Sequence, residues 1–314
     1  MAFNAFSIYA IKINTKGTTN DVFLDQILNQ SHNFNQSIIK MMSDGAADPT
    51  FSAVGKLNSD IRFSTSKVAT ALSKGGISGF VIDSDETNPG AEFYLQQHQP
   101  GGTRKTGSTH MKATLANGIL VPMSLSAGSE EMARMEFMAV GVYDGTNAPI
   151  SYTASQALPA DTLTVDQMFF SGPVNINGTQ FEGVQSFNVD FGVNLNRRGG
   201  DGLPYDTFVN IANRVPIIKF TTLDVEKAMT LVGANGVGHT NDNCEYYLRK
   251  AANGGTRVAD ATEEHIKLTS YKGTILVKEL SGDSGEIIGA EVEVHPVYDG
   301  TNAVIAVNTA SAIA

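Results

Sequence analysis

One six-residue stretch, YDGTNA, occurs twice in this chain of 314 residues, at Tyr143–Ala148 and again at Tyr298–Ala303. Counted from Tyr143 to Tyr298, the two copies lie 155 positions apart, which is close to half the length of the chain. A repeat of this length is too long for one unit of a solenoid or propeller, but it is an ordinary domain size. We therefore expect the chain to fold as two similar units in tandem.

The likeness between the two halves extends beyond this turn. The segment EFYLQQHQPGGTR begins at Glu92 and EYYLRKAANGGTR begins at Glu245, and seven of their thirteen positions are identical. IRFST at 61–65 has a counterpart in IKFTT at 218–222. These landmarks come in the same order in both halves, and the spacing between counterparts drifts by only a few residues, as small insertions and deletions in loops would produce.

Length and composition point to the same organisation. The chain is longer than a single hydrophobic core usually allows, so we predict two tandem homologous domains, at residues 1–158 and 159–314, with a linker at Ala154–Thr162. Charged residues make up only 17% of the chain, so long charged helices are not expected. Alternating apolar and polar segments predict a mainly β fold, in which two β-sandwich or barrel domains each carry one flanking α-helix.

Short-range signals place the helices and turns. One helix is expected over residues 66–76 and another over 223–233, each ending at glycine. Three pairs predict tight turns between strands: Asn117-Gly118, Asn177-Gly178 and Lys272-Gly273.

The repeated YDGTNA is itself a predicted turn. Asp can accept hydrogen bonds from the backbone that follows it, and Gly tolerates a positive φ. The residues concerned are Tyr143, Asp144 and Gly145 in the first copy and Tyr298, Asp299 and Gly300 in the second. The turn occurs twice because, on this interpretation, the whole domain occurs twice.

The bulk composition argues against several classes of protein. The formal net charge is −10 and no basic cluster is present, which argues against tight nucleic-acid binding. The single cysteine, Cys244, cannot form an intramolecular disulfide or a zinc site by itself. No apolar run is long enough to span a membrane, and the N-terminal segment lacks the basic region and cleavage site of a signal peptide. We therefore expect synthesis in a reducing cytoplasm and no membrane association.

Signals for catalysis or metal binding are weak. None of the six histidines is spaced from another as metal ligands are. GANGVG at 233–238 follows a predicted helix rather than a strand, so a helix end is favoured over a dinucleotide-binding loop. The adjacent carboxylates Glu130-Glu131 and Glu263-Glu264 are expected at the surface. We predict no catalytic, cofactor-binding or metal site, and no enzymatic activity.

Each half contains a Gly-containing loop after its first strands, and the loop appears longer in the second half. Arg197 and Arg198 in the second loop are suited to pairing with carboxylates of a neighbouring subunit. The predicted contact residues between subunits or rings are Asp44, Asp48, Arg197, Arg198, Asp201 and Tyr205.

Three segments carry a resemblance to a known family. They are GVQSFNVDFGVNL at 183–195 ahead of the long loop, RVPIIKFTTLDVEKAMTL at 214–231 where a strand leads into a helix, and EVEVHPVYDGTNAVIAV at 291–307. With the duplication, these segments resemble the major tail tube proteins of long, flexible-tailed bacteriophages. The resemblance covers each half nearly end to end and depends on the order of elements.

This resemblance implies a β-sandwich whose inner sheets join between subunits around a lumen. Because most members carry one such domain and form hexamers, a duplicated chain would form homotrimeric, pseudo-hexameric rings that stack into a tube. Its partners would be further copies of itself and other tail proteins at the tube ends. The tape measure protein and the genomic DNA would pass through the lumen without specific binding, and an acidic lumen would repel DNA phosphates. The protein would be made in the host cytoplasm and reside in the virion tail.

Two other interpretations of the sequence remain open. The chain could be another phage structural component, such as a capsid, baseplate or tail-terminator protein. It could also be a pair of carbohydrate-binding β-sandwiches, which would require an exposed aromatic platform at Phe93-Tyr94 or Tyr246-Tyr247.

Overall fold

The computed structural model describes residues 4–14, 22–83, 90–99, 101–160, 168–232, 238–252, 254–282 and 287–313. These residues form 22 strands and two helices. The prediction of a mainly β protein is therefore confirmed.

The first half of the chain contains twelve strands and one helix. They are β1 (Ala5–Ile13), β2 (Val22–Leu24), β3 (Ile27–Asn33), β4 (Gln36–Met41), β5 (Phe51–Leu57), β6 (Asp60–Thr65), α1 (Val68–Gly75), β7 (Phe80–Asp83), β8 (Ala91–His98), β9 (His110–Leu115), β10 (Asn117–Gly128), β11 (Arg134–Gly141) and β12 (Ser151–Gln156).

The second half contains ten strands and one helix. They are β13 (Met168–Ile176), β14 (Thr179–Phe181), β15 (Val184–Asp190), β16 (Val193–Arg198), β17 (Phe208–Arg214), β18 (Ile217–Thr222), α2 (Val225–Thr230), β19 (His239–Ala251), β20 (His265–Ser281), β21 (Gly289–Pro296) and β22 (Ala306–Ser311).

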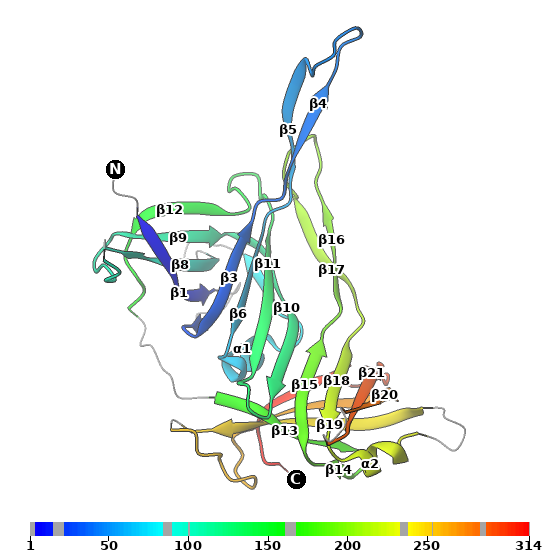
Figure 1. Cartoon of the computed structure of the whole chain (residues 1–314). Coiled ribbons are helices and arrows are strands. Elements are labelled where there is room, and N and C mark those ends of the chain that lie inside the picture. Colours follow the sequence, from blue (N-terminus) through cyan, green and yellow to red (C-terminus); the bar gives the residue numbers. More distant parts are fainter. Residues whose placement is uncertain are drawn as a thin grey trace.

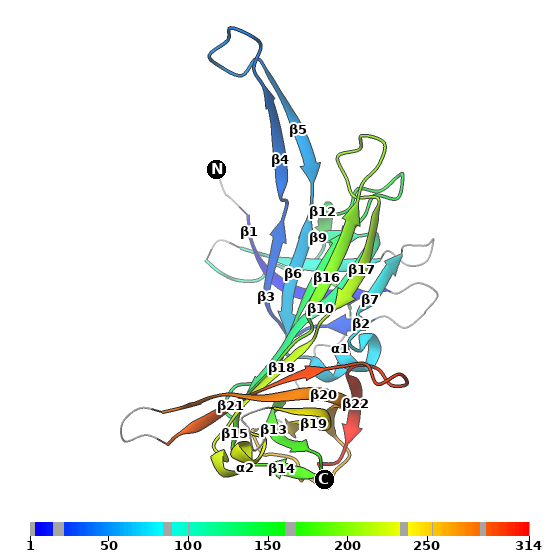
Figure 2. The same ribbon diagram turned by 90° about the vertical axis from the view of Figure 1, so that its right-hand side faces the viewer.

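A single large sheet runs through both halves of the molecule. Its 13 strands include the sequence β14-β13-β19-β20-β21-β18-β15-β10-β11-β6-β3, with β22 and β7 joined at its sides. A five-stranded sheet, β12-β9-β8-β1-β2, belongs to the first half alone. The hairpins β4–β5 and β16–β17 form two further two-stranded sheets, and both extend in the same direction from the body (Figures 1 and 2).

Most strand pairings of the first half have a counterpart in the second half. β1 pairs with β2 and β8, as β13 pairs with β14 and β19, and β6 pairs with β3 and β11, as β18 pairs with β15 and β21. Even the register agrees, because Gly118 lies opposite Gly141 and Gly273 lies opposite Pro296, 155 positions further along. The irregularity after Pro122 in β10 recurs after Val277 in β20. The two halves are therefore alike in topology, while their division at residues 158 and 159 stays a prediction.

The predicted linker between the halves overlaps the last strand of the first half. The predicted linker Ala154–Thr162 begins inside β12, because Ala154 to Gln156 complete that strand. Residues 157–160 follow without regular structure, and residues 161–167 lie outside the described residues.

Two of the three predicted tight turns are wrong. At Asn117-Gly118 and Lys272-Gly273 the chain does not reverse, since β10 starts directly after β9 and β20 runs straight through. In the first half β9 pairs with β8 and β10 then pairs with β11, and in the second half the single strand β20 pairs first with β19 and then with β21. Glycine is needed at the first site because Gly118 has φ of 149° and a Cβ there would lie 2.0 Å from the Val140 carbonyl oxygen. At both sites the glycine-containing pair therefore lies in a strand region where the chain passes from one partner strand to the next.

The third predicted turn is confirmed. Asn177 and Gly178 have φ of 49° and 81° and link β13 to β14. The Asn175 side chain accepts a hydrogen bond from the Gly178 backbone at 2.8 Å. Both central residues thus have the positive φ that a two-residue hairpin turn requires.

One helix follows the first strands of each half, as predicted, although both are shorter than expected. α1 ends at Gly75, and Gly76 adopts φ of 53°. α2 is capped by Asp224, which accepts a hydrogen bond from the Lys227 backbone at 3.3 Å. The predicted end at Gly233 lies outside the described residues.

Aromatic side chains pack together in the core of each half. In the first half, the Phe63 ring lies 5.9 Å from Phe93 and 5.2 Å from Phe137. In the second half, Tyr246 occupies the place of Phe93 and lies 5.4 Å from Phe187. All five rings are buried, so each half has an aromatic centre of its own.

The two hairpins have the same length, which corrects the expectation of a longer second loop. They span residues 36–57 and 193–214, and every paired position in one has its counterpart 157 residues along in the other. The segments QSIIKM and FSAVGKL contain apolar residues and resemble core strands, so the sequence did not indicate the first hairpin. In the folded chain Ile38, Ile39, Met41, Phe51 and Val54 are exposed.

Candidate assembly interface

The two halves are joined inside the chain by a strand-to-strand junction, here called the internal junction. β10 and β15 pair antiparallel from Ser124 opposite Asp190 to Gly128 opposite Ser186. At its centre Leu125 lies opposite Val189, and both side chains are fully buried. This pair packs into the core of the molecule and makes the large sheet continuous.

Backbone hydrogen bonds extend the internal junction on both sides of this pairing. The Ala133 backbone N–H donates to the Phe169 carbonyl at 2.6 Å, and the Phe191 N–H donates to the Met123 carbonyl at 3.0 Å. Phe169 and Phe191 are themselves buried. The second half therefore covers a strip of the first half with both main-chain and apolar contacts.

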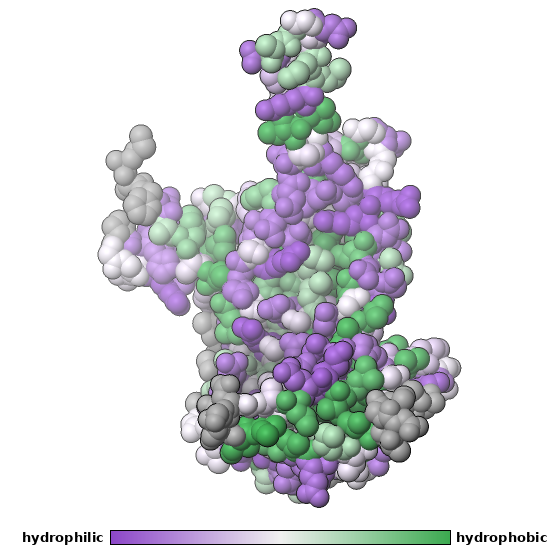
Figure 3. Space-filling view, turned by 45° about the vertical axis from the view of Figure 1, so that its right-hand side comes forward, coloured by the Kyte–Doolittle hydropathy of each residue, from purple (hydrophilic) through white to green (hydrophobic). Residues whose placement is uncertain are grey.

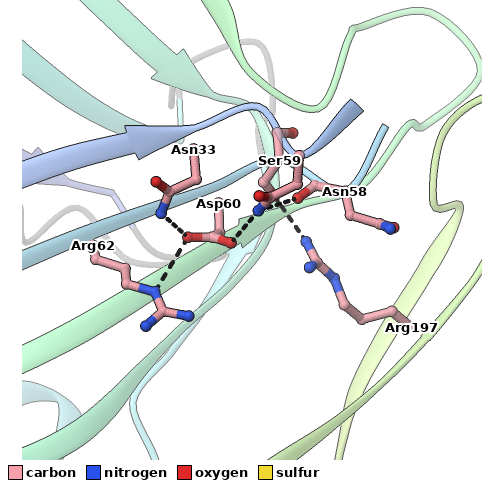
Figure 4. Close-up of polar contacts among 7 residues, drawn as sticks. Asn33, Asn58, Ser59, Asp60, Arg62 and Arg197 are labelled. Carbon is pink, nitrogen blue, oxygen red and sulfur yellow. Dashed lines mark hydrogen bonds and ion pairs between the residues drawn. The ribbon is translucent and has the colours of Figure 1, made fainter. Parts of the chain in front are cut away.

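The hairpin β16–β17 adds a polar contact to the internal junction. Asp206 is buried and forms ion pairs with Lys56 at 2.6 Å and with Arg197 at 3.4 Å. Arg197 also donates to the Ser59 carbonyl of the first half at 2.8 Å (Figure 4). Arg197, which was predicted to contact a neighbouring subunit, thus binds within its own chain.

Tyr205 is also placed at the internal junction. Its ring lies 5.5 Å from that of Tyr143, whose backbone N–H donates to the Asp206 carbonyl at 2.7 Å. The other predicted contact residues do not lie with Tyr205 at the internal junction. All four are exposed towards the ends of the two hairpins: Asp44, Asp48, Arg198 and Asp201.

Both copies of YDGTNA form the predicted turn with nearly identical geometry. Asp144 accepts hydrogen bonds from the Asn147 backbone at 2.7 Å and side chain at 2.8 Å, and Asp299 does the same with Asn302. These bonds lower the pKa of both carboxyl groups. Gly145 and Gly300 have φ of 98° and 96°. The surroundings differ, since Tyr143 packs against Tyr205 whereas Tyr298 is exposed.

Two strand edges in the described part of the chain resemble the two sides of the internal junction but have no partner strand. One is β3, the last strand in the order of the large sheet and the counterpart of β15. The other is the end of β20 at residues 278–281, which pairs with β21 on one side only and is the counterpart of the part of β10 that binds β15. An unpaired edge is a template for another strand.

Side chains that are buried at the internal junction have exposed counterparts in β1, directly after β3, in β20 and directly before β21. Phe169, Phe191, Leu125 and Ala133 are 2%, 1%, 0% and 0% exposed, whereas their counterparts Phe6, Phe34, Leu280 and Ile288 are 39%, 55%, 44% and 52% exposed. Apolar surface is visible on the lower part of the molecule, where the second half lies (Figure 3). The free chain thus exposes two surfaces that correspond to the two sides of the internal junction.

The β3 edge carries a cluster that the sequence alone did not single out. His32 Nδ1 lies 2.7 Å from the Tyr152 hydroxyl, and its Nε2 contacts the Gln30 side chain. The His32 ring meets Phe93 edge-on at 6.3 Å, and Phe34 lies 5.9 Å from Tyr152. Burial lowers the pKa of His32. Aligning the two halves would have revealed the site, because His32 occupies the position of Val189.

Asp60 fixes the end of this edge. Its carboxylate accepts hydrogen bonds from the side chains of Asn33 at 2.8 Å, Asn35 at 3.3 Å and Arg62 at 3.3 Å (Figure 4). Because Asp60 is buried, these three partners compensate for its desolvation. The backbone of β3 is therefore held in place up to its last residue.

The face of the large sheet that points away from the aromatic centres carries charges of both signs. Its ionisable side chains include Arg62, Arg134, Lys219, Lys278, Glu136, Asp190, Glu279, Glu291, Glu293 and His295. Lys219 lies 3.3 Å from Glu293, whose hydrogen bond and charge raise the pKa of Lys219. This face is mixed in charge rather than uniformly acidic.

Several other possible sites are not supported. The aromatic side chains considered as a carbohydrate platform, Phe93, Tyr94, Tyr246 and Tyr247, are all buried, so they form no exposed platform. Burial raises the pKa of the Cys244 thiol to about 12. Among the described residues there is no cluster of three His, Cys, Asp or Glu suited to a metal ion. No helix in the described part of the chain is long and apolar enough to cross a membrane.

Comparison with known proteins adds no assignment. The sequence matches no protein-family profile and no curated protein.

Proposed function

We propose that this chain is the structural subunit of a bacteriophage tail tube, in which trimeric, pseudo-hexameric rings stack around a DNA-conducting lumen. In this proposal the two halves are duplicated β-sandwich domains, and each domain occupies one of six similar positions in a ring. The chain then acts through assembly, without catalysis or a cofactor.

The observation that carries the proposal is the internal junction together with its two open counterparts. The exposed edge of β3 is the equivalent of β15. The exposed end of β20 is the equivalent of the part of β10 that pairs with β15. A second copy that repeats the internal geometry would therefore pair β3 with β20. Applying the internal register places Ser31 opposite Ser281, His32 opposite Leu280 and Asn33 opposite Glu279. Such a contact is head to tail, and head-to-tail contacts generate either closed rings or open filaments.

The exposed apolar side chains support the same arrangement. Phe6 and Phe34 in the first half and Leu280 and Ile288 in the second leave apolar area in contact with water in the free chain. Each buried Å² of such area contributes about 25 cal/mol to association, before the entropy of association is subtracted. Lateral assembly would cover all four side chains, as the internal junction covers their counterparts.

The mixed face of the large sheet suits a lumen for DNA. If the internal junction repeats around a ring, this face forms a continuous lining. Its lysines and arginines lie among carboxylates, as in the pairing of Lys219 with Glu293, and so present no basic patch to bind phosphates. A polymer such as DNA or the tape measure protein would meet a polar surface that does not retain it.

Negative-stain electron microscopy of the purified protein tests the proposal. We expect tubes of stacked rings at high protein concentration. Single rings that never stack would favour a terminator or baseplate protein, and closed shells would favour a capsid protein. A chain that stays monomeric at every concentration would contradict all of these assignments.

A further inference from the structure

The two sides of the proposed chain-to-chain junction differ from the internal junction at its centre. In the internal junction Val189 faces Leu125, and both are apolar and fully buried. At the open edge the position of Val189 is taken by His32, and that of Phe187 by Gln30. A titratable side chain therefore occupies the place that a second copy would cover.

Among the residues that the structure describes, burial is the cause that lowers the pKa of His32, and no carboxylate contributes to the shift. On the side that faces the core it packs against Phe93 and the Tyr152 hydroxyl, and Gln30 meets its other nitrogen. The ionisable groups of the neighbouring strands alternate to the opposite faces from Ile61, which pairs with His32, from Phe93, which the His32 ring contacts, and from Ala113, which pairs with Phe93. Those groups are Asp60, Arg62, Glu92 and Lys112.

A second copy would bring little compensation. The residue expected opposite His32 is Leu280, and the charged residues before it in β20 are Lys278 and Glu279. Glu279 lies opposite Glu291, on the mixed face of the sheet rather than on the core side. His32 would thus be covered by an apolar side chain, which favours its neutral form.

We propose that protonation of His32 opens the junction between chains while the internal junction stays closed, so that assembly is reversed by mild acid. This inference rests on the proposed function, because it concerns the regulation of the same interface. The internal junction has Val189, which does not titrate, at this position and therefore does not respond to the change in pH.

The sign of the effect follows from the two states of His32. The assembled chain holds His32 neutral, whereas the free chain lets it take up a proton once the pH falls below its pKa. Acid therefore favours the free chain, and the association constant falls by up to about tenfold per pH unit for each junction. The change begins below the ordinary histidine pKa of about 6.5, since burial lowers the value in the free chain already.

Sedimentation velocity of the full chain at about pH 7.5 and about pH 5 tests the inference, because the ordinary histidine pKa lies between these values. Two variants accompany it: His32→Val, which copies the internal junction, and His32→Gln, which keeps a polar side chain without a titratable group. The control is His98→Gln, since His98 contacts Ser7 within the five-stranded sheet, whereas β3 belongs to the large sheet. Wild type and His98→Gln should dissociate at the lower pH, whereas both His32 variants should stay assembled.

The possible failures are distinguishable. If wild type assembles equally at both pH values, or if both His32 variants dissociate in acid as wild type does, the inference is overturned and the proposed assembly stands. If wild type stays monomeric at both pH values, the proposed function fails and this inference fails with it.

Discussion

Leu125 and Leu280 occupy equivalent positions in the two halves, yet the first is fully buried and the second is nearly half exposed. This difference predicts different consequences for the same substitution. Leu125→Ala should lower the free energy of unfolding of the monomer by about 2–5 kcal/mol, because it opens a cavity in the core. Leu280→Ala should change it by less than about 0.5 kcal/mol, because the side chain is already solvated.

Urea unfolding at low protein concentration measures the first effect, and sedimentation at high concentration measures the second. We expect Leu280→Ala to weaken assembly while leaving the monomer stable. Equal losses of monomer stability in the two variants would show that position 280 is already buried by the chain itself, against our account.

The repeated turn predicts a pH dependence of stability. The hydrogen bonds from Asn147 and Asn302 lower the pKa of Asp144 and Asp299. A carboxyl group whose pKa is depressed by folding contributes stability above its unfolded value of about 3.9, and this contribution is lost as the pH falls through the folded value. Unfolding midpoints in urea between about pH 6 and about pH 3 should therefore fall less steeply in Asp144→Asn than in wild type. If the unfolding midpoint of the variant falls with pH as steeply as that of wild type, the Asp144 charge does not contribute to the pH dependence of stability.

Among the elements, the bent strands β10 and β20 decide how the two layers of each half connect. At Gly118 a Cβ would lie 2.0 Å from the Val140 carbonyl oxygen, whereas at Gly273 the nearest atom is 3.2 Å away. Gly118→Ala should therefore destabilise the chain by at least about 1–3 kcal/mol, with the strained φ adding to the clash. Gly273→Ala serves as the matched control and should cost less. Thermal unfolding followed by circular dichroism measures both, and a larger loss in Gly273→Ala would contradict the proposed role of Gly118.

The same elements show how far sequence reasoning reaches. Alternation predicted the strands, and Asn177-Gly178 predicted a true hairpin because both residues must adopt positive φ to reverse the chain. Asn117-Gly118 carries the same two letters, but there the glycine lets two backbones approach closely. Which of the two applies depends on the neighbouring strand β11, which no local pattern encodes.

The candidate site was only partly predictable for a similar reason. The sequence singled out the Gly-containing loops as contacts between subunits, but Arg197 and Tyr205 bind the first half of their own chain. Their partners, Ser59 and Tyr143, are far away in the sequence, and only the pairing of β10 with β15 brings them near. His32 was missed because a single histidine in a strand carries no signal until its counterpart Val189 is known to be buried.

On the scale of the whole molecule, the chain contains one complete junction and two unmatched halves of another. Covalent linkage keeps the internal junction at high effective concentration, so it forms in every chain. The junction between chains lacks this advantage and has His32 and Gln30 where the internal one has Val189 and Phe187. We therefore expect assembly to depend on protein concentration, whereas the fold of the monomer does not.

The central claim is that β3 of one chain pairs with β20 of the next in the register of the internal junction. Oxidative crosslinking of a chain that carries both Ser31→Cys and Ser281→Cys tests it directly, since Cys244 is buried and should not react. A chain with Ser126→Cys and Asn188→Cys is the matched control, because these residues are paired within the chain. Our account predicts an internal disulfide in the control and disulfide-linked dimers and trimers in the test chain, with trimers as the end point. A test chain that forms no disulfide between chains, while the control crosslinks, would contradict it.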